Sequence, residues 1–249
     1  MRILICIDDT DQKGGPGTGH LAQDICDDIE KRGWGTCSAI SRHQLFVHPD
    51  IPYTSHNSSL CFASSIGKGR LDDVIRLGGD FLAARSAPGS DPGLCVAVEE
   101  GKLARNRLIQ FGRNAKQTVL TKGDAYGLAK ELGIHLSEHG GTGQGVVGAL
   151  AGIGLRLSGN DGRFRGWYHL GREGESMLVR DLRSYAFIDK VKSEEGGEVL
   201  EDDAVVYFED DQQKTVLQDS VQVLLVKKAL TRSGSFQWAA LTKQQVKKF

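Results

Sequence analysis

The order of apolar and polar positions predicts alternating strands and helices over the first 160 residues. Residues 2–7 form a nearly continuous apolar run, which is typical of a buried strand. Apolar side chains recur at helical spacing in residues 20–32, 71–85 and 146–157. Further predicted strands are 36–45, 60–66, 94–98 and 134–136, and further predicted helices are 102–111 and 123–132.

The pattern changes near the end of this region. Short β-type runs at 177–179, 185–188, 204–208, 221–226 and 236–241 are separated by charged turns, which predicts a small antiparallel sheet or barrel. The clearest break before them is the Pro- and Gly-rich stretch 87–93. We therefore expect an α+β protein with divisions 1–92, 93–166 and 167–249.

Composition narrows the class of protein. The chain has 249 residues, of which 39% are hydrophobic and 25% charged, and these ordinary values exclude a disordered tail protein. No apolar run approaches the ~20 residues that cross a bilayer, and no basic and apolar leader is visible. The five cysteines form no CxxC pair, which favours reduced thiols in a cytoplasmic protein without membrane contact or structural zinc.

The near-neutral net charge of −1 conceals an uneven distribution. Residues 1–100 carry 9 Lys/Arg and 14 Asp/Glu, whereas residues 101–170 carry 10 and 4. An acidic first part suits a metal ion and a basic middle part suits phosphates. Two oppositely charged surfaces that attract each other would give the same pattern.

Three carboxylates follow the first predicted strand, at Asp8, Asp9 and Asp11. Their mutual repulsion is costly unless water or a cation neutralises it. Mg²⁺ prefers such hard oxygen ligands and commonly combines one or two carboxylates with substrate phosphates. The cluster is a candidate magnesium site, and a solvated acidic turn is the alternative.

A glycine-rich segment then leads to Thr18 at the start of the first predicted helix. Free N–H groups at a helix N-terminus favour anions, so Thr18 is a candidate to contact a phosphate or to accept a phosphoryl group. The alternative is an N-cap threonine after a flexible turn.

A second glycine-rich loop precedes the helix predicted at 146–157. It consists of Gly140, Gly141, Thr142, Gly143, Gln144 and Gly145. Asp161 lies too near for the ribose-binding acid of a dinucleotide fold, and no Walker A lysine is present. A phosphate cradle of backbone amides and tight helix packing through Gly148, Gly152 and Gly154 both remain open.

Downstream, Arg163 and Arg165 flank Phe164. Two arginines around an aromatic ring suit a phosphate clamp or stacking on a base. A charged hairpin is an equally good interpretation.

These segments together resemble archaeal tRNA(Ile) agmatinylcytidine synthetases, over roughly residues 1–165. The resemblance rests on Ile7-Asp8-Asp9-Thr10-Asp11, on Gly17-Thr18, on residues 49–53 (Pro-Asp-Ile-Pro-Tyr), and on residues 143–150 with Arg163 downstream. It implies a kinase-like catalytic domain with a ferredoxin-like domain, ATP and Mg²⁺ as cofactors, and tRNA as partner. It also implies metal binding by Asp8, Asp9 and Asp11 and phosphorylation of Thr18.

The chain departs from that family at several positions. Residues 54–56 read Thr-Ser-His where the family has Lys-Thr-Arg, Gly19 replaces a second threonine, and the cysteine zinc ribbon is absent.

Three candidate functions follow. The first is an ATP- and Mg²⁺-dependent phosphoryl-transfer enzyme, a kinase-like transferase or ligase, whose acceptor is an RNA or a nucleoside. In it, residues 140–145, Arg163 and Arg165 hold the phosphates. The alternative is a non-catalytic nucleotide-sensing or RNA-binding module, and a phosphotransferase for small molecules is a lesser third.

Overall fold

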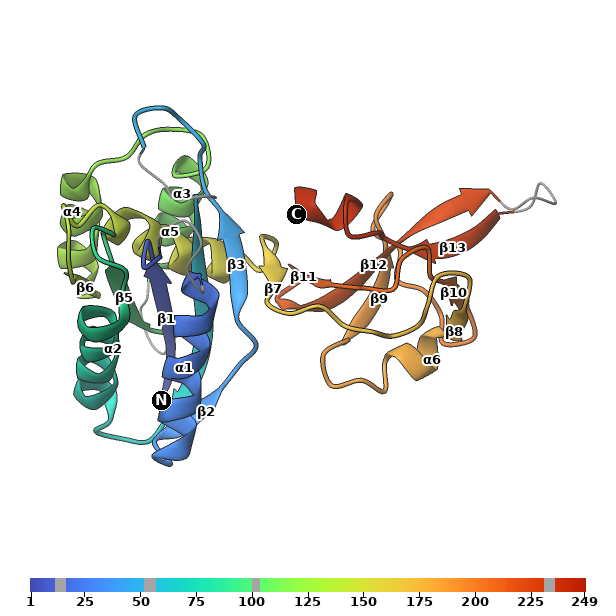
Figure 1. Ribbon diagram of the computed structural model, residues 1–249, viewed down its shortest axis with the longest axis horizontal. Coiled ribbons are helices and arrows are strands. Elements are labelled where there is room, and N and C mark those ends of the chain that lie inside the picture. Colours follow the sequence, from blue (N-terminus) through green and yellow to red (C-terminus); the bar gives the residue numbers. More distant parts are fainter. Residues whose placement is uncertain (12–16, 52–56, 100–103, 231–235) are drawn as a thin grey trace. The chain divides into compact units, whose positions relative to one another are not determined.

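The acidic first strand lies at the centre of a sheet in the computed structural model, which describes residues 1–11, 17–51, 57–99, 104–230 and 236–249. The chain forms two compact units, Met1–Ser158 and Gly159–Phe249. In the first, the strands lie in the order β6-β5-β1-β4-β3, with β2 also paired to β4 (Figure 1). Their bounds are β1 Arg2–Asp8, β2 Gly35–Cys37, β3 Ser41–Gln44, β4 Ser58–Ile66, β5 Gly93–Val98 and β6 His135–Glu138.

Helices cover both faces of this sheet, and every strand pair in it is antiparallel (Figure 1). Helices α1 (Thr18–Lys31) and α2 (Leu71–Arg85) cover one face. Helices α3 (Arg105–Asn114), α4 (Lys122–Leu132) and α5 (Gly145–Ser158) cover the other. The mixed α/β fold class is confirmed, and the expected boundaries at residues 92 and 166 stay predictions.

Side-chain alternation along β1 divides the core. Ile3, Ile5 and Ile7 pack under α1 and α2, whereas Leu4 and Cys6 face α5. Each is at most 2% exposed, and burying such an aliphatic side chain stabilises the fold by roughly 1.5–3 kcal/mol. Because both faces are covered, β1 reads as a continuous apolar run instead of an alternating one.

Cysteines line the α5 face of the three central strands. Cys6 pairs in register with Cys61 of β4 and with Cys95 of β5, and all three are buried. Burial raises the pKa of the Cys6 thiol well above its usual range. All five cysteines carry free thiols, as predicted.

The sequence predictions differ from this unit in three places. The strand predicted at 36–45 is two strands, β2 and β3. The helix predicted at 102–111 is α3, Arg105–Asn114, whose N-cap is Ala104. Thr18 is the first residue of α1, and its N-cap is Gly17, with φ 79° and ψ 151°. The N-cap interpretation of Thr18 is therefore wrong.

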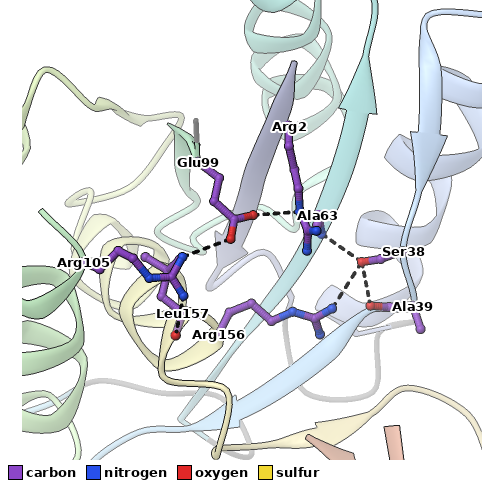
Figure 2. A network of polar contacts seen from close by, with 8 residues as sticks. All are labelled: Arg2, Ser38, Ala39, Ala63, Glu99, Arg105, Arg156 and Leu157. Carbon is purple, nitrogen blue, oxygen red and sulfur yellow. Dashed lines mark hydrogen bonds and ion pairs between the residues drawn. The ribbon is translucent and has the colours of Figure 1, made fainter. Parts of the chain in front are cut away.

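Charged side chains gather at the end of the sheet where β1 begins (Figure 2). Glu99 lies between Arg2 and Arg105, with N–O distances of 2.7 Å and 3.1 Å. Arg105 also donates to the Leu157 carbonyl at 3.1 Å, and Arg156 donates to Ser38 Oγ at 3.2 Å. Burial lowers the pKa of the Arg156 guanidinium. The Glu99 carboxylate therefore forms ion pairs with two arginines, Arg2 and Arg105, in a cluster that also includes Arg156.

The second unit is rich in strands. They lie in the order β7-β11-β12-β13-β10-β8, with β9 also paired to β12. Their bounds are β7 Arg163–Phe164, β8 Ser176–Leu178, β9 Lys190–Ser193, β10 Val205–Tyr207, β11 Thr215–Gln218, β12 Val221–Leu230 and β13 Phe236–Ala240, with α6 at Val179–Leu182 and a 3₁₀ turn at Gln245–Lys248.

Two predictions for this unit are wrong. The sheet is mixed, because β9 runs parallel to β12 and β10 runs parallel to β13. Residues 185–188, predicted as a strand, form turns, and Tyr185 is exposed. The Phe187 ring stacks on the Tyr168 ring, with 3.7 Å between the ring centroids. This ring contact, and not strand pairing, accounts for the apolar residues of the segment. Across the described residues, no helix has the length and apolar composition to span a membrane.

Candidate functional site

The acidic end of β1 meets the start of α5. Asp8, the last residue of β1, is only 7% exposed and points to the same face as Leu4 and Cys6. A Cβ at Gly148 would overlap Asp8 Oδ2, and a Cβ at Gly145 would lie 3.1 Å from the Asp8 carbonyl oxygen. The structure thus brings together the acidic motif and the helix that follows the glycine loop.

Burial and neighbouring negative charges raise the pKa values of two carboxyl groups in this motif. The pKa of Asp8 is raised to about 8, first by burial and then by the charge of Asp9. The pKa of Asp9 is raised to about 6, by burial and by the charges of Asp91 and Asp11. Asp9 also has a positive φ of 50°, which is uncommon outside glycine. Strongly raised carboxylate pKa values are typical of functional sites.

Asp11 faces the start of α1. Its Oδ2 lies 3.6 Å from the position of a Cβ at Gly17, next to Thr18. The negative charge of Asp11 also acts on Arg42 of β3, whose pKa burial lowers and Asp11 partly restores. Arg42 donates to Ser58 Oγ at 2.8 Å. Sequence reasoning missed this arginine, since nothing in the spacing of β3 relates it to the acidic motif.

Thr18 is buried, with 7% of its surface exposed. It stands at the first turn of α1, where backbone N–H groups attract anions. The glycine-rich residues 14–16 before it lie outside the described residues, as do residues 52–56, which include the Pro-Tyr of the resemblance and its Thr-Ser-His departure.

The glycine loop approaches α5 through a left-handed turn. Gly141 and Gly143 have φ of 55° and 74°, values that side chains disfavour. The Gly145 N–H donates to the Asp91 carbonyl at 3.0 Å, and the Val147 N–H donates to the Gln144 carbonyl at 3.1 Å. Within the described part of the chain, the N–H groups of Gly143 and Gln144 have no hydrogen-bond acceptor.

Both interpretations of the glycines therefore find support in the geometry. Gly148 lies against Asp8, Gly152 against Cys6 and Ser59, and Gly154 against the Leu108 carbonyl, so helix packing requires small residues there. The preceding loop offers two backbone donors, and paired N–H groups of this kind suit a phosphate oxygen.

Asp91 is a site residue that sequence reasoning missed. It is 8% exposed and lies just before β5, in the stretch interpreted as a chain break. Its carboxylate accepts hydrogen bonds from the Thr142 N–H and, at 2.7 Å, from Thr142 Oγ1. An aspartate among prolines and glycines is the only signal that the sequence offers for it.

Arg163 and Arg165 belong to the second unit. Arg163 is in β7 and pairs in register with Val216 of the distant strand β11, so residues 160–165 do not form the local hairpin that was the alternative interpretation. Their contact with a phosphate stays a prediction.

Carboxylate oxygens at the end of β1 have the donor chemistry that Mg²⁺ prefers. In residues 1–11, 17–51, 57–99, 104–230 and 236–249, no three His, Cys, Asp or Glu side chains are placed to hold a metal ion together. Mg²⁺ commonly takes one or two protein carboxylates and completes its shell with phosphates and water. Asp8 and Asp9, whose charges act on each other, fit that smaller ligand set.

The fold of the chain is similar to that of tRNA-modifying enzymes of known structure. It matches TiaS, a tRNA agmatidine synthetase, in complex with its isoleucine tRNA and ATP at a TM-score of 0.55 and 20% identity, over 89% of this chain and 56% of that chain. Apo TiaS matches at 0.53 and 21% identity, over 80% and 48%. A tRNA fluorescent labeling enzyme matches at 0.53 and 22% identity, over 73% and 42%.

These similarities show the fold. The chain spans about half the length of the solved structures that it matches. No protein-family model and no curated protein matches it.

Proposed function

We propose that the chain is an ATP- and Mg²⁺-dependent phosphoryl-transfer enzyme whose acceptor is a tRNA or another RNA or nucleoside. The observation that carries the proposal is the contact between the Asp8 carboxylate and Gly148 of α5. This contact supports the proposal because α5 directly follows the loop with two backbone donors, and phosphoryl transfer needs chiefly positioning and charge neutralisation.

Each residue then has a role. Asp8 and Asp9 hold the metal, which would supply positive charge to the triphosphate when bound, and Asp11 stays a predicted third ligand. Gly143 and Gln144 donate backbone hydrogen bonds to phosphate oxygens. Arg163 and Arg165, which belong to the second unit, stay predicted phosphate contacts. Thr18 takes or positions the transferred group. The neighbours solved with ATP and tRNA support nucleotide and RNA as partners. A cytoplasmic location stays a prediction.

A non-catalytic nucleotide sensor or RNA-binding module is the second candidate. The burial of Thr18 favours it, because a hydroxyl on a residue that is 7% exposed has little access to a γ-phosphate. Under this alternative the acidic motif and the loop still bind nucleotide, but no phosphate is transferred.

One experiment separates the two functions. Purified protein is incubated with labelled ATP and Mg²⁺, with and without total tRNA, beside Asp8→Asn, Thr18→Ala and, as control, Asp72→Asn in the exposed first turn of α2. The enzyme predicts turnover in the wild type and Asp72→Asn, and a loss of about 100-fold or more in Asp8→Asn, as for other charge-stabilising groups. Intact mass shows phosphate on the wild type but not on Thr18→Ala. Equal background turnover in all four proteins would reject the enzyme.

A further inference from the structure

Asp91 connects the two halves of the candidate site. Both oxygens of its carboxylate accept hydrogen bonds from Thr142, one from the backbone N–H and one from the hydroxyl. Its carbonyl accepts the Gly145 N–H at 3.0 Å. One residue just before β5 thus holds the glycine loop at its middle and at its end.

The same residue also faces the acidic motif. The charge of Asp91 acts on the carboxyl of Asp9, and the Asp91 backbone hydrogen-bonds with that carboxyl. Asp91 is therefore in contact with the acidic motif on one side and with the glycine loop on the other. Within the described residues, no other side chain bonds to the loop and also acts on Asp9.

The loop depends on such an anchor. Glycine adopts positive and negative φ about equally well, so the glycines of the loop do not fix its conformation themselves. Contacts with the rest of the protein must fix it. Lys122 supplies one, donating to the Thr142 carbonyl at 2.7 Å. Thr142 is thereby held by three hydrogen bonds, two of them to a carboxylate, and charge-assisted bonds are roughly twice as strong as neutral ones.

We propose that Asp91 is a positioning residue for the nucleotide: by holding Thr142 it fixes the loop in the conformation that leaves the Gly143 and Gln144 N–H groups available to phosphate. This inference rests on the proposed nucleotide site. Asp91 acts through Thr142, so removing Asp91 weakens ATP binding more than it slows the chemical step. An interaction that holds substrate and transition state equally changes KM and leaves kcat nearly constant.

The test is a double-mutant cycle of Asp91→Asn and Thr142→Val, with kcat and KM for ATP measured for each variant. The expected result is a KM raised about tenfold or more in Asp91→Asn with kcat changed less than about threefold. Because Asp91 acts through Thr142, the double variant is no worse than Asp91→Asn alone. Asp210→Asn is the matched control, since Asp210 also accepts backbone N–H groups, from Gln212 and Lys243, but lies in the second unit.

Amide hydrogen exchange measures the positioning without nucleotide. Asp91→Asn accelerates exchange across residues 140–145 and leaves α2 unchanged, whereas Asp210→Asn leaves the loop as in the wild type. Unchanged exchange in the loop, or additive effects on KM, overturns the role of Asp91. Faster loop exchange in Asp91→Asn, together with a wild type that never binds ATP, instead overturns the proposed function and with it the nucleotide role.

Discussion

Gly148 and Asp8 touch across the interface between α5 and β1, with no room for a methyl group at residue 148. The two residues are far apart in sequence, yet the absence of a side chain at residue 148 leaves the space that the Asp8 carboxylate fills. Asp8 is buried against helix backbone and not solvated in an acidic turn. The site therefore tolerates little change at the glycine.

Gly148→Ala is expected to destabilise the protein by about 1–3 kcal/mol, because the added methyl must displace the Asp8 carboxylate. The control is Gly127→Ala in α4, where an added Cβ meets nothing within 4 Å. That change should stabilise by up to about 1 kcal/mol, since alanine favours helix. Urea unfolding measures both. Equal effects of the two substitutions would show that the Asp8 contact does not constrain residue 148.

Stability without divalent cations should fall as pH rises from about 4 to 8. The folded-state pKa values of Asp8 and Asp9, about 8 and about 6, lie above the ordinary value of 3.8. The folded protein therefore binds protons more tightly than the unfolded chain, and this stabilisation is complete below the unfolded pKa and lost through the folded pKa. Its size for Asp8 is at most on the order of 6 kcal/mol.

Asp8→Asn tests this assignment, because asparagine resembles the protonated acid. The variant should show a flatter dependence of unfolding free energy on pH between about 5 and 8 in the presence of EDTA. Added Mg²⁺ should stabilise the wild type more at about pH 8 than at about pH 6 and should not do so in the variant. Parallel pH curves for wild type and Asp8→Asn would place the titrating groups elsewhere.

Ser59→Ala should be neutral or stabilising by about 1 kcal/mol. Ser59 Oγ is fully buried on the α5 face and has no hydrogen-bond partner among the described residues. Its desolvation therefore destabilises the fold, and no hydrogen bond offsets that cost. Ser64→Ala is the matched control on the same strand. Its hydroxyl donates to the Thr36 carbonyl at 3.2 Å, so its removal should cost about 1 kcal/mol. Thermal unfolding compares the two, and a clear loss in Ser59→Ala contradicts the prediction.

Glu99→Gln should cost about 1 kcal/mol at low salt, the upper end for partly exposed pairs, because it removes the carboxylate that Arg2 and Arg105 share and whose charge also acts on buried Arg156. The loss should shrink in about 1 M NaCl, where repulsion among the cations is screened. Glu131→Gln, in an exposed pair with Arg107, should leave the unfolding midpoint unchanged. Salt-independent loss in Glu99→Gln would point to packing instead of charge.

Local patterns in the sequence were sufficient for much of the first unit. The apolar run of β1 and the helical spacing of α2 and α5 reflect burial by neighbours, and burial leaves a period in the sequence. The acidic motif and the glycine loop were each recognisable from residue types that suit cations and phosphates. The phosphoryl-transfer hypothesis assigned both to one nucleotide, but nothing in the sequence indicated that they meet at Gly148.

What was missed depends on contacts between distant segments. Asp91 lies among prolines and glycines that mark a turn, and nothing nearby shows that Thr142 is its partner. Strand 36–45 is divided because residues 38–40 leave the ladder, where Ser38 Oγ accepts the Ala63 N–H. The turns at 185–188 carry β-type residues because Phe187 stacks on Tyr168, a tertiary contact without sequence period.

The two ends of β1 lie at opposite ends of the sheet. Asp8 is at one end, and Met1, whose amino group donates to the Ile66 carbonyl at 3.0 Å, precedes the other. Seven residues of strand span roughly 20 Å. A fluorophore or surface tether attached near residue 1 would therefore lie far from the Asp8 carboxylate and would leave the proposed nucleotide site unobstructed.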